Sequence, residues 1–151
     1  MAFEGKPQKI ELQPNVTVNE IREDGIDVFN RLMVTNFEMP AEWKETMDRL
    51  LVDFMRKGTR NYLAYVDGQP VGTTSLFSKN KTGCILNVST LKEFRNRGIG
   101  AQLTMHAVSD SFKERNDLHT LQTHKGGDAE RLYRKIGFNI DHTVSYLVKK
   151  L

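Results

Sequence analysis

The chain has 151 residues, of which 38% are hydrophobic and 27% charged, and its formal net charge is +3. This length suits one domain with a core that needs no disulfide or metal, and no apolar run approaches the roughly 20 residues that span a bilayer. The basic residues are spread among acidic ones, which argues against a tract that follows a nucleic-acid backbone. The single cysteine, Cys84, and the lack of a secretory leader pattern favour a cytoplasmic protein with no nucleic-acid or membrane partner.

The first half of the chain predicts a lead-in segment, a strand, two helices and a hairpin. Residues 1–15 carry two prolines and are expected to form an N-terminal arm or an edge strand; a homodimer contact and the remnant of a longer chain also remain open. Alternating apolar residues predict a strand over 16–21, and helical spacing predicts helices over about 26–33 and 40–58. Strands joined by a tight turn are expected over 61–66 and 71–77.

The second half predicts three more strands and two more helices. A strand over 84–90 leads to a helix from Gly98 to about Glu114, and a strand over 118–123 leads to a short helix that ends before Gly137. A final strand is expected over 138–151. The order is β-α-α-β-β-β-α-β-α-β, which predicts a mixed α/β domain.

The most informative stretch joins the strand over 84–90 to the following helix. The first turn of a helix leaves backbone N–H groups unpaired and carries a partial positive charge, so it is suited to bind an anion. Gly98 and Gly100 remove the Cβ atoms that would hold a phosphate away from the backbone, and Arg95 and Arg97 add positive charge. The sequence therefore predicts a phosphate-binding turn between a strand and a helix.

Other glycine-rich turns fit less well. A P-loop requires Lys followed by Ser or Thr after its last glycine, whereas Ala101 and Gln102 follow here. A dinucleotide fingerprint requires a third small residue where Leu103 stands, in a unit near the start of the fold. A helix start that binds nothing is the remaining alternative from the residues alone.

Two motifs resemble those of the GNAT superfamily of N-acetyltransferases. Arg95-x-x-Gly98-x-Gly100-Ala101 resembles the loop that binds the pyrophosphate of acyl-coenzyme A in that family. Leu132-Tyr133-x-x-x-Gly137-Phe138 is similar to the signature on the family's fourth helix. The resemblance implies a mostly antiparallel sheet of six or seven strands with about four helices, splayed between the fourth and fifth strands. It also implies that residues 16–151 form a single acetyltransferase-like domain.

The resemblance further implies a binding mode for acetyl-CoA, with no metal. The backbone of Val88, Ser89 and Thr90 would hold the pantetheine arm, with the Val88 N–H polarising the thioester carbonyl. The amides of Asn96, Arg97, Gly98, Ile99, Gly100 and Ala101 would hold the pyrophosphate, with Arg95 at the entrance of the loop. Gly126 stands where the family often has an asparagine that contacts the coenzyme arm, so that contact is not expected here.

For catalysis, the resemblance implies direct attack of a primary amine on the thioester, without an acyl-enzyme, and Tyr133 as the acid that protonates the leaving thiolate. His124, Glu38 and Glu42 are candidates for the general base, but none stands at a position that the family defines, so no base is assigned. The acceptor, a small molecule or a peptide amine, cannot be identified from the sequence. Two alternatives remain: a GNAT-like module that binds acyl-CoA without catalysis, and a nucleotide-binding protein of another fold.

Overall fold

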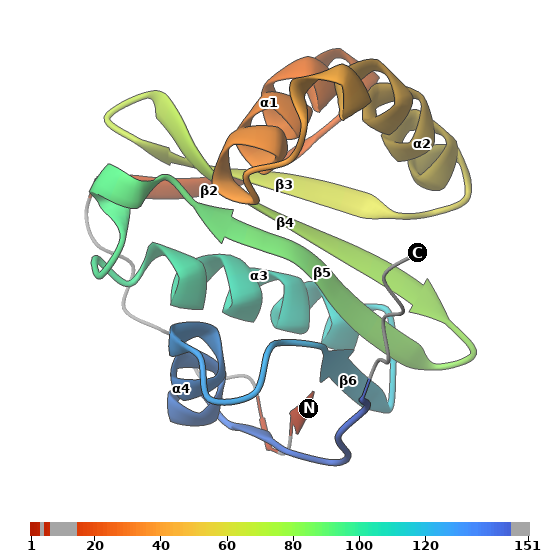
Figure 1. Cartoon of the computed structure of the whole chain (residues 1–151). Coiled ribbons are helices and arrows are strands. Elements are labelled where there is room, and N and C mark those ends of the chain that lie inside the picture. The colour runs from red at the N-terminus through yellow and green to blue at the C-terminus, as the bar shows by residue number, and fades with distance from the viewer. Residues whose placement is uncertain (4, 7–14, 146–151) are drawn as a thin grey trace, which may run out of the picture.

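A seven-stranded sheet organises the described part of the chain, which comprises residues 1–3, 5–6 and 15–145 of this computed structural model (Figure 1). The strands lie in the order β2-β3-β4-β5-β6-β1-β7, and among them only β5 and β6 run parallel. Their bounds are β1 Ala2–Phe3, β2 Val16–Ile21, β3 Arg60–Val66, β4 Gln69–Lys79, β5 Thr82–Thr90, β6 Leu118–Leu121 and β7 Phe138–Asn139. The expected mixed α/β fold with a mostly antiparallel sheet is confirmed.

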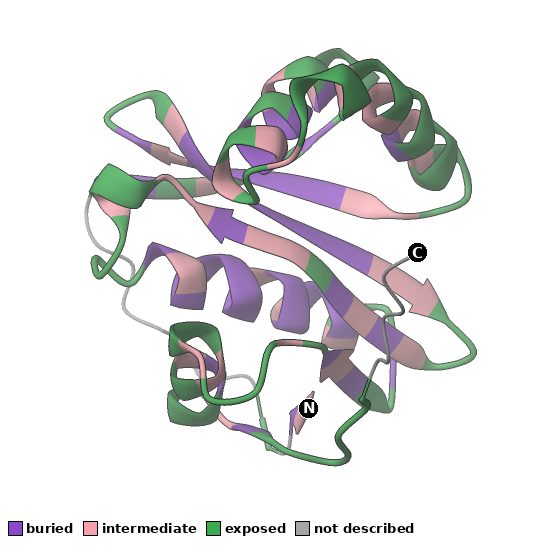
Figure 2. Ribbon diagram, viewed as in Figure 1, coloured by how far each residue is buried: buried purple, intermediate pink, exposed green. Residues whose placement is uncertain are grey.

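The described α-helices cover both faces of this sheet. Helices α1 and α2 lie on one face, and α3 and α4 lie on the other (Figure 1). Their bounds are α1 Ile26–Asn36, α2 Lys44–Arg56, α3 Ile99–Lys113 and α4 Asp128–Lys135. Helix α3 is buried along most of its length, because it packs on β4 and β5 and carries α4 on its outer side (Figure 2). Within the described residues, no helix is both long and apolar enough to cross a membrane.

Residues 2 and 3 form strand β1 in the interior of the sheet, so for them the expectation of an arm or an edge strand is wrong. Residues 4 and 7–14 of the predicted lead-in segment lie outside the described residues. Strand β1 lies between β6 and β7 and pairs antiparallel with both. The terminal amino group of Met1 donates to the Leu121 carbonyl at 2.8 Å, and the Leu121 N–H donates to the Met1 carbonyl at 3.0 Å. One buried side chain, Phe3, anchors the segment against the Phe138 ring at 5.3 Å between centroids. Two residues of strand are too few to show an alternating pattern in the sequence.

The predicted final strand over 138–151 is also wrong in extent. Strand β7 ends at Asn139, residues 140–145 form no strand, and residues 146–151 lie outside the described part. Phe138 is fully buried, but Ile140 and Val144 are exposed, so the apolar residues that suggested a longer strand have no core to cover. Without a buried face or a second partner, continued pairing has little to stabilise it.

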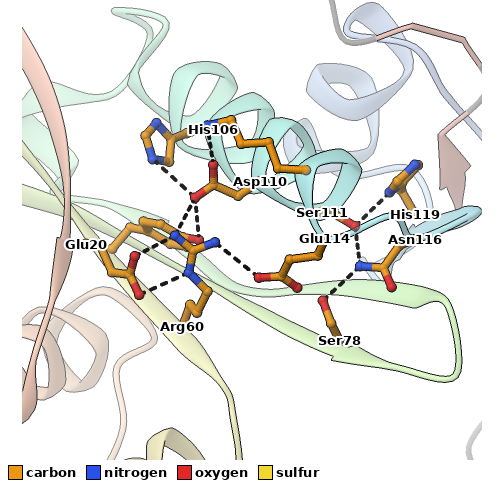
Figure 3. A network of polar contacts seen from close by, with 11 residues as sticks. Glu20, Arg60, Ser78, His106, Asp110, Ser111, Glu114, Asn116 and His119 are labelled. Carbon is orange, nitrogen blue, oxygen red and sulfur yellow. Dashed lines mark hydrogen bonds and ion pairs between the residues drawn. The ribbon is translucent and has the colours of Figure 1, made fainter.

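A buried carboxylate fastens α3 to the edge of the sheet. Asp110 accepts hydrogen bonds from the Tyr62 hydroxyl at 2.9 Å and Lys113 Nζ at 2.7 Å, and it pairs with Arg60 at 2.8 Å (Figure 3). Arg60 also contacts Glu20 and Glu114, so β2, β3 and α3 share one network. Burial alone would raise the pKa of Asp110, but these hydrogen bonds and the charge of Arg60 outweigh it and lower the pKa below its ordinary value of 3.8.

A second polar cluster joins α3 to β6 and β4. Ser111 Oγ lies 2.7 Å from His119 Nδ1, and Asn116 Nδ2 donates to both Ser111 and Ser78 (Figure 3). Ser111 and His119 are buried, and burial lowers the pKa of His119, so the imidazole is neutral at pH 7. This pair resembles part of a hydrolytic triad only in residue type, because a nucleophile must be reachable by substrate. Its hydrogen bonds attach the end of α3 to β6 and, through Asn116, to β4.

Replacing the buried carboxylate should weaken the fold in a pH-dependent way. We expect Asp110→Asn to lower the free energy of unfolding at pH 7 by about 3 kcal/mol, because Arg60 loses its most buried partner. A lowered native pKa gives stability that is present above about pH 4 and lost as the pH falls below it. Urea unfolding should therefore show that the free energy of unfolding falls more between pH 7 and pH 3 in the wild type than in Asp110→Asn.

The matched control is Asp53→Asn, which removes an exposed helical carboxylate paired with Lys57. It should change the free energy of unfolding by less than about 0.5 kcal/mol. Equal effects of the two substitutions would contradict the role given to Asp110.

Candidate functional site

Strand β5 loses its neighbour halfway along its length. It pairs with β6 from Thr82 to Ile85, and β6 then ends at Leu121 while β5 continues to Thr90. Residues 86–90 therefore have no partner on that side among the described strands. This is the splay expected between the fourth and fifth predicted strands, and it is confirmed. This stretch, which is unpaired on the β6 side only, contains Val88, Ser89 and Thr90. These three residues were expected to hold a ligand arm.

A β-bulge lies in the same stretch. On β4, Thr73 pairs with Ser89 and Ser75 pairs with Leu86, so one residue of β4 faces two residues of β5, Asn87 and Val88. Asn87 has a φ of 55°, in the left-handed region that asparagine tolerates better than most residues. Val88 thus has no register partner on β4 or on β6. On the β6 side, its backbone faces no described strand.

The backbone N–H groups of residues 96–101, named here the donor row, lie in the connection from β5 to α3 and in the first turn of α3. Asn96 and Gly98 have φ values of 61° and 75°, and Gly98 is the residue that precedes α3. No described residue accepts a hydrogen bond from the N–H groups of residues 96–101, whereas the Gln102 N–H already bonds to the Gly98 carbonyl. Successive free amides at a helix start form a concave donor surface with partial positive charge. All the loop residues predicted from the sequence are in this connection.

Glycine is needed at positions 98 and 100 for different structural reasons. Gly98 is required by its left-handed φ, and a Cβ there would meet no atom within 4 Å. At Gly100 a Cβ would lie 3.2 Å from Leu132 Cδ2 of α4 and 3.8 Å from Thr90 Oγ1. Gly100 therefore also lets α4 and the end of β5 approach the start of α3. The sequence predicted room for a phosphate at both glycines, but not this packing at Gly100.

Two arginines stand beside the donor row. Arg95 is exposed and its Nε donates to the Thr90 carbonyl at 3.1 Å, which ties the loop back to the end of β5. The Arg97 guanidinium lies over the Phe94 ring at 5.2 Å from its centroid. Both side chains belong to the connection that leads into the first turn of α3.

Tyr133 lies on α4, next to the residue that touches Gly100. Its side chain is buried and packs edge-on against the Phe138 ring, with 5.9 Å between centroids. Val88 packs against the same apolar cluster, so the helix tyrosine and the bulge border one part of the core. Burial raises the pKa of Tyr133 to about 12, which keeps the phenol protonated across the neutral range.

The candidate bases are not gathered around these groups. Glu38, Glu42 and His124 are all exposed. Glu38 follows the end of α1, where Asn36 Nδ2 donates to Ser89 Oγ at 2.9 Å, so this end of α1 is attached to β5. Within the described residues, none of these three side chains takes part in a hydrogen bond or an ion pair, so no base is assigned.

Polar side chains behind the bulge were not predicted from the sequence. Asn36, Asn61, Thr73, Ser75 and Asn87 are hydrogen-bonded around it. One signal was available: Asn87 interrupts the apolar run of residues 84–88, where a polar residue indicates a bulge or a function. The other residues stand in ordinary strand or helix patterns and gave none.

These features agree with the comparison against known families. The sequence matches the acetyltransferase (GNAT) domain family over residues 57–140, more than half of the chain. The protein therefore belongs to this family of acetyltransferase domains. The matched region contains β5, the donor row, Tyr133 and the splay.

Solved structures share the whole fold. The protein is similar to a GCN5-related N-acetyltransferase from Ralstonia eutropha JMP134, with 15% identity, a TM-score of 0.72, and coverage of 88% of this chain and 98% of the other. A predicted acetyltransferase from Clostridium acetobutylicum, solved with acetyl-CoA, gives 15% identity, a TM-score of 0.70 and coverage of 87% and 96%. The PaiA N-acetyltransferase from Thermoplasma acidophilum, solved with coenzyme A, gives 15% identity, a TM-score of 0.72, and coverage of 85% of this chain and 92% of the other. At such identities the likeness shows the fold, and comparison with curated proteins gives no match.

Proposed function

We propose that the protein transfers the acetyl group of acetyl-CoA directly to a primary amine, without an acyl-enzyme. The observation that carries this proposal is a continuous path of backbone: residues 86–90 of β5, which no described strand pairs on the β6 side, lead to residues 96–101, whose N–H groups no described residue accepts. A diphosphate linked to an extended amide-bearing arm has the acceptors that such a path needs. Family membership and a relative solved with acetyl-CoA support this choice of ligand.

In this proposal each part of the site has a separate task. The amides of residues 96–101 hold the pyrophosphate, and the charges of Arg95 and Arg97 add to the attraction. Residues 88–90 pair with the pantetheine arm where β6 has ended, so the arm completes the sheet. The bound thioester supplies the activated acetyl group. The Val88 N–H polarises its carbonyl and stabilises the negative charge that develops on that oxygen.

Tyr133 is proposed as the group that protonates the departing thiolate. A phenol with a pKa near 12 is a weaker acid than a free thiol, whose pKa is about 8.5. Tyr133 therefore first donates a hydrogen bond to the sulfur while charge develops and then passes its proton to the thiolate. The phenolate is reprotonated through water by the proton that the amine has lost. No side chain is assigned as the base, and water is proposed to carry the amine's proton away.

The acceptor is proposed to be a small molecule or a peptide amine, and the site of action the cytosol, where a single free cysteine such as Cys84 is stable. Release of free thiol from acetyl-CoA is the assay, run with small amines, amino acids, aminoglycosides, polyamines and peptide N-termini. Tight binding of acetyl-CoA with no thiol release from any acceptor would favour the non-catalytic alternative.

A charge placed at the donor row should prevent coenzyme binding. We expect Gly100→Asp to abolish the thermal stabilisation by acetyl-CoA, because a carboxylate would stand where phosphate binds. In the wild type, ligand at about 100 times its dissociation constant should add ~2.7 kcal/mol of stability. ATP and NAD should add much less.

Gly100→Asn is the control, since it has the same shape and the same contact with Leu132 but no charge. It should keep more coenzyme affinity than Gly100→Asp, by about tenfold or more. If Gly100→Asp binds acetyl-CoA as tightly as the wild type, the assignment of the donor row is wrong.

Removing the phenolic hydroxyl should affect the chemical step alone. We expect Tyr133→Phe to lower kcat by about 10- to 100-fold, with the KM for acetyl-CoA almost unchanged. Because the phenol stays protonated below about pH 12, the rate ratio of wild type to variant should be constant between pH 6 and pH 9. An unaltered kcat would remove Tyr133 from the mechanism.

A further inference from the structure

Six uncharged polar side chains surround the bulge of β5, on the face covered by α1. They form one connected set of hydrogen bonds, named here the bulge clamp: Asn36 of α1, Asn61 of β3, Thr73 and Ser75 of β4, and Asn87 and Ser89 of β5. Asn61, Thr73 and Ser75 are fully buried. Burying this many polar groups is costly unless they are paired, so a fold that keeps them gains something from their positions.

One branch of the clamp ends on the backbone of the bulge. The Thr73 hydroxyl lies 2.7 Å from the Asn87 carbonyl, and since that oxygen can only accept, Thr73 is the donor. Thr73 Oγ1 is also 2.8 Å from Ser89 Oγ, so the Ser89 hydroxyl donates to it. Asn36 Nδ2 donates to Ser89 in turn. The direction of every bond in this branch is thereby fixed toward the Asn87 carbonyl.

The other branch holds the side chain of the same residue. Asn87 Nδ2 donates to Ser75 Oγ at 3.0 Å, and Ser75 donates to Asn61 Oδ1 at 2.5 Å. Asn61 Nδ2 is buried and has no partner among the described residues. Asn61 is therefore retained for what its oxygen accepts, although its donor is left unsatisfied.

Fixing the Asn87 carbonyl also fixes the direction of the Val88 N–H. The Asn87 carbonyl and the Val88 N–H belong to one planar trans peptide, so they point in opposite directions. The Thr73 bond draws the carbonyl toward β4. The Val88 N–H must then point away from Thr73, to the side where β5 has no partner beyond Ile85.

We propose that Thr73, together with Ser75 and Asn61, is a positioning residue of the acetyl-transfer site: the clamp aims the Val88 N–H at the thioester carbonyl. This inference rests on the proposed function. None of the six side chains titrates near neutral pH, so the aim of this N–H does not change with pH. The left-handed φ of Asn87 is the strained conformation that the clamp maintains.

The test uses two neighbouring threonines of β4. Thr73→Val removes the hydroxyl but keeps the shape, and it should lower kcat by about 10- to 100-fold, with the KM for acetyl-CoA within about threefold. The pH profile of kcat should keep its shape. Thr73→Ser restores the hydroxyl and should recover kcat to within about threefold of the wild type.

Thr74→Val is the matched control, because Thr74 is equally buried and its hydroxyl contacts the Leu86 carbonyl only at 3.4 Å. It should leave kcat within about twofold of the wild type. If Thr73→Val behaves like Thr74→Val, or if Thr73→Ser does not recover activity, the positioning role is refuted.

A second readout does not need turnover. In ¹⁵N-labelled protein, the amide resonance of Val88 should shift more in Thr73→Val than in Thr74→Val, and an unmoved Val88 resonance would refute the clamp. If the wild type transfers no acetyl group to any amine, the proposed function fails, whereas an active wild type with an active Thr73→Val refutes the clamp alone. Should Thr73→Val unfold, Ser75→Ala takes its place in both measurements, with the same expected loss and the same refuting result.

Discussion

The end of pairing between β5 and β6 is the constraint on which the site depends. Backbone N–H and C=O groups normally find partners within the sheet, and a strand that leaves its neighbour must satisfy them elsewhere. Here the pairing stops at Ile85 and Leu121, while β5 runs on to Thr90 and directly into the loop before α3. Along the same path, the bulge leaves Val88 without a register partner, and the start of α3 presents N–H groups that no described residue accepts. A ligand with acceptors in extended order is the natural complement of this path.

The rest of the fold keeps that opening in place. Helix α3 is held to the edge of the sheet through Asp110 and Arg60, and to β6 through Ser111 and His119. Strand β1 completes the far half of the sheet by pairing with both β6 and β7. On the opposite face, Asn36 attaches the end of α1 to β5. The opening is thus bordered on each side by elements with independent attachments.

The glycine-rich turn and the helix tyrosine could be predicted from the sequence because each is local. Consecutive residues form a strand, a turn with Gly98 and Gly100, and the start of a helix. Their spacing is therefore enough to predict the local geometry. Strand β1 could not be predicted, because two residues show no pattern and their partners are Thr120 and Phe138, more than a hundred residues away. The bulge clamp could not be predicted from the sequence either, because it also depends on contacts between distant residues. Thr73 and Ser75 alternate like any strand residues, and only the register with β5 shows what they hold.

The backbone from Val88 to the start of α3 is the part of the chain that we propose binds an acyl-coenzyme A. Titration of ¹⁵N-labelled protein with coenzyme A, followed by amide chemical shifts, reports on each of these amides separately. The largest shifts should fall on Val88, Ile99, Gly100 and Ala101, while amides of the hairpin turn at Asp67 and Gly68 stay unchanged. Saturable binding that leaves those four amides unmoved and shifts residues of α2 instead would contradict this binding mode.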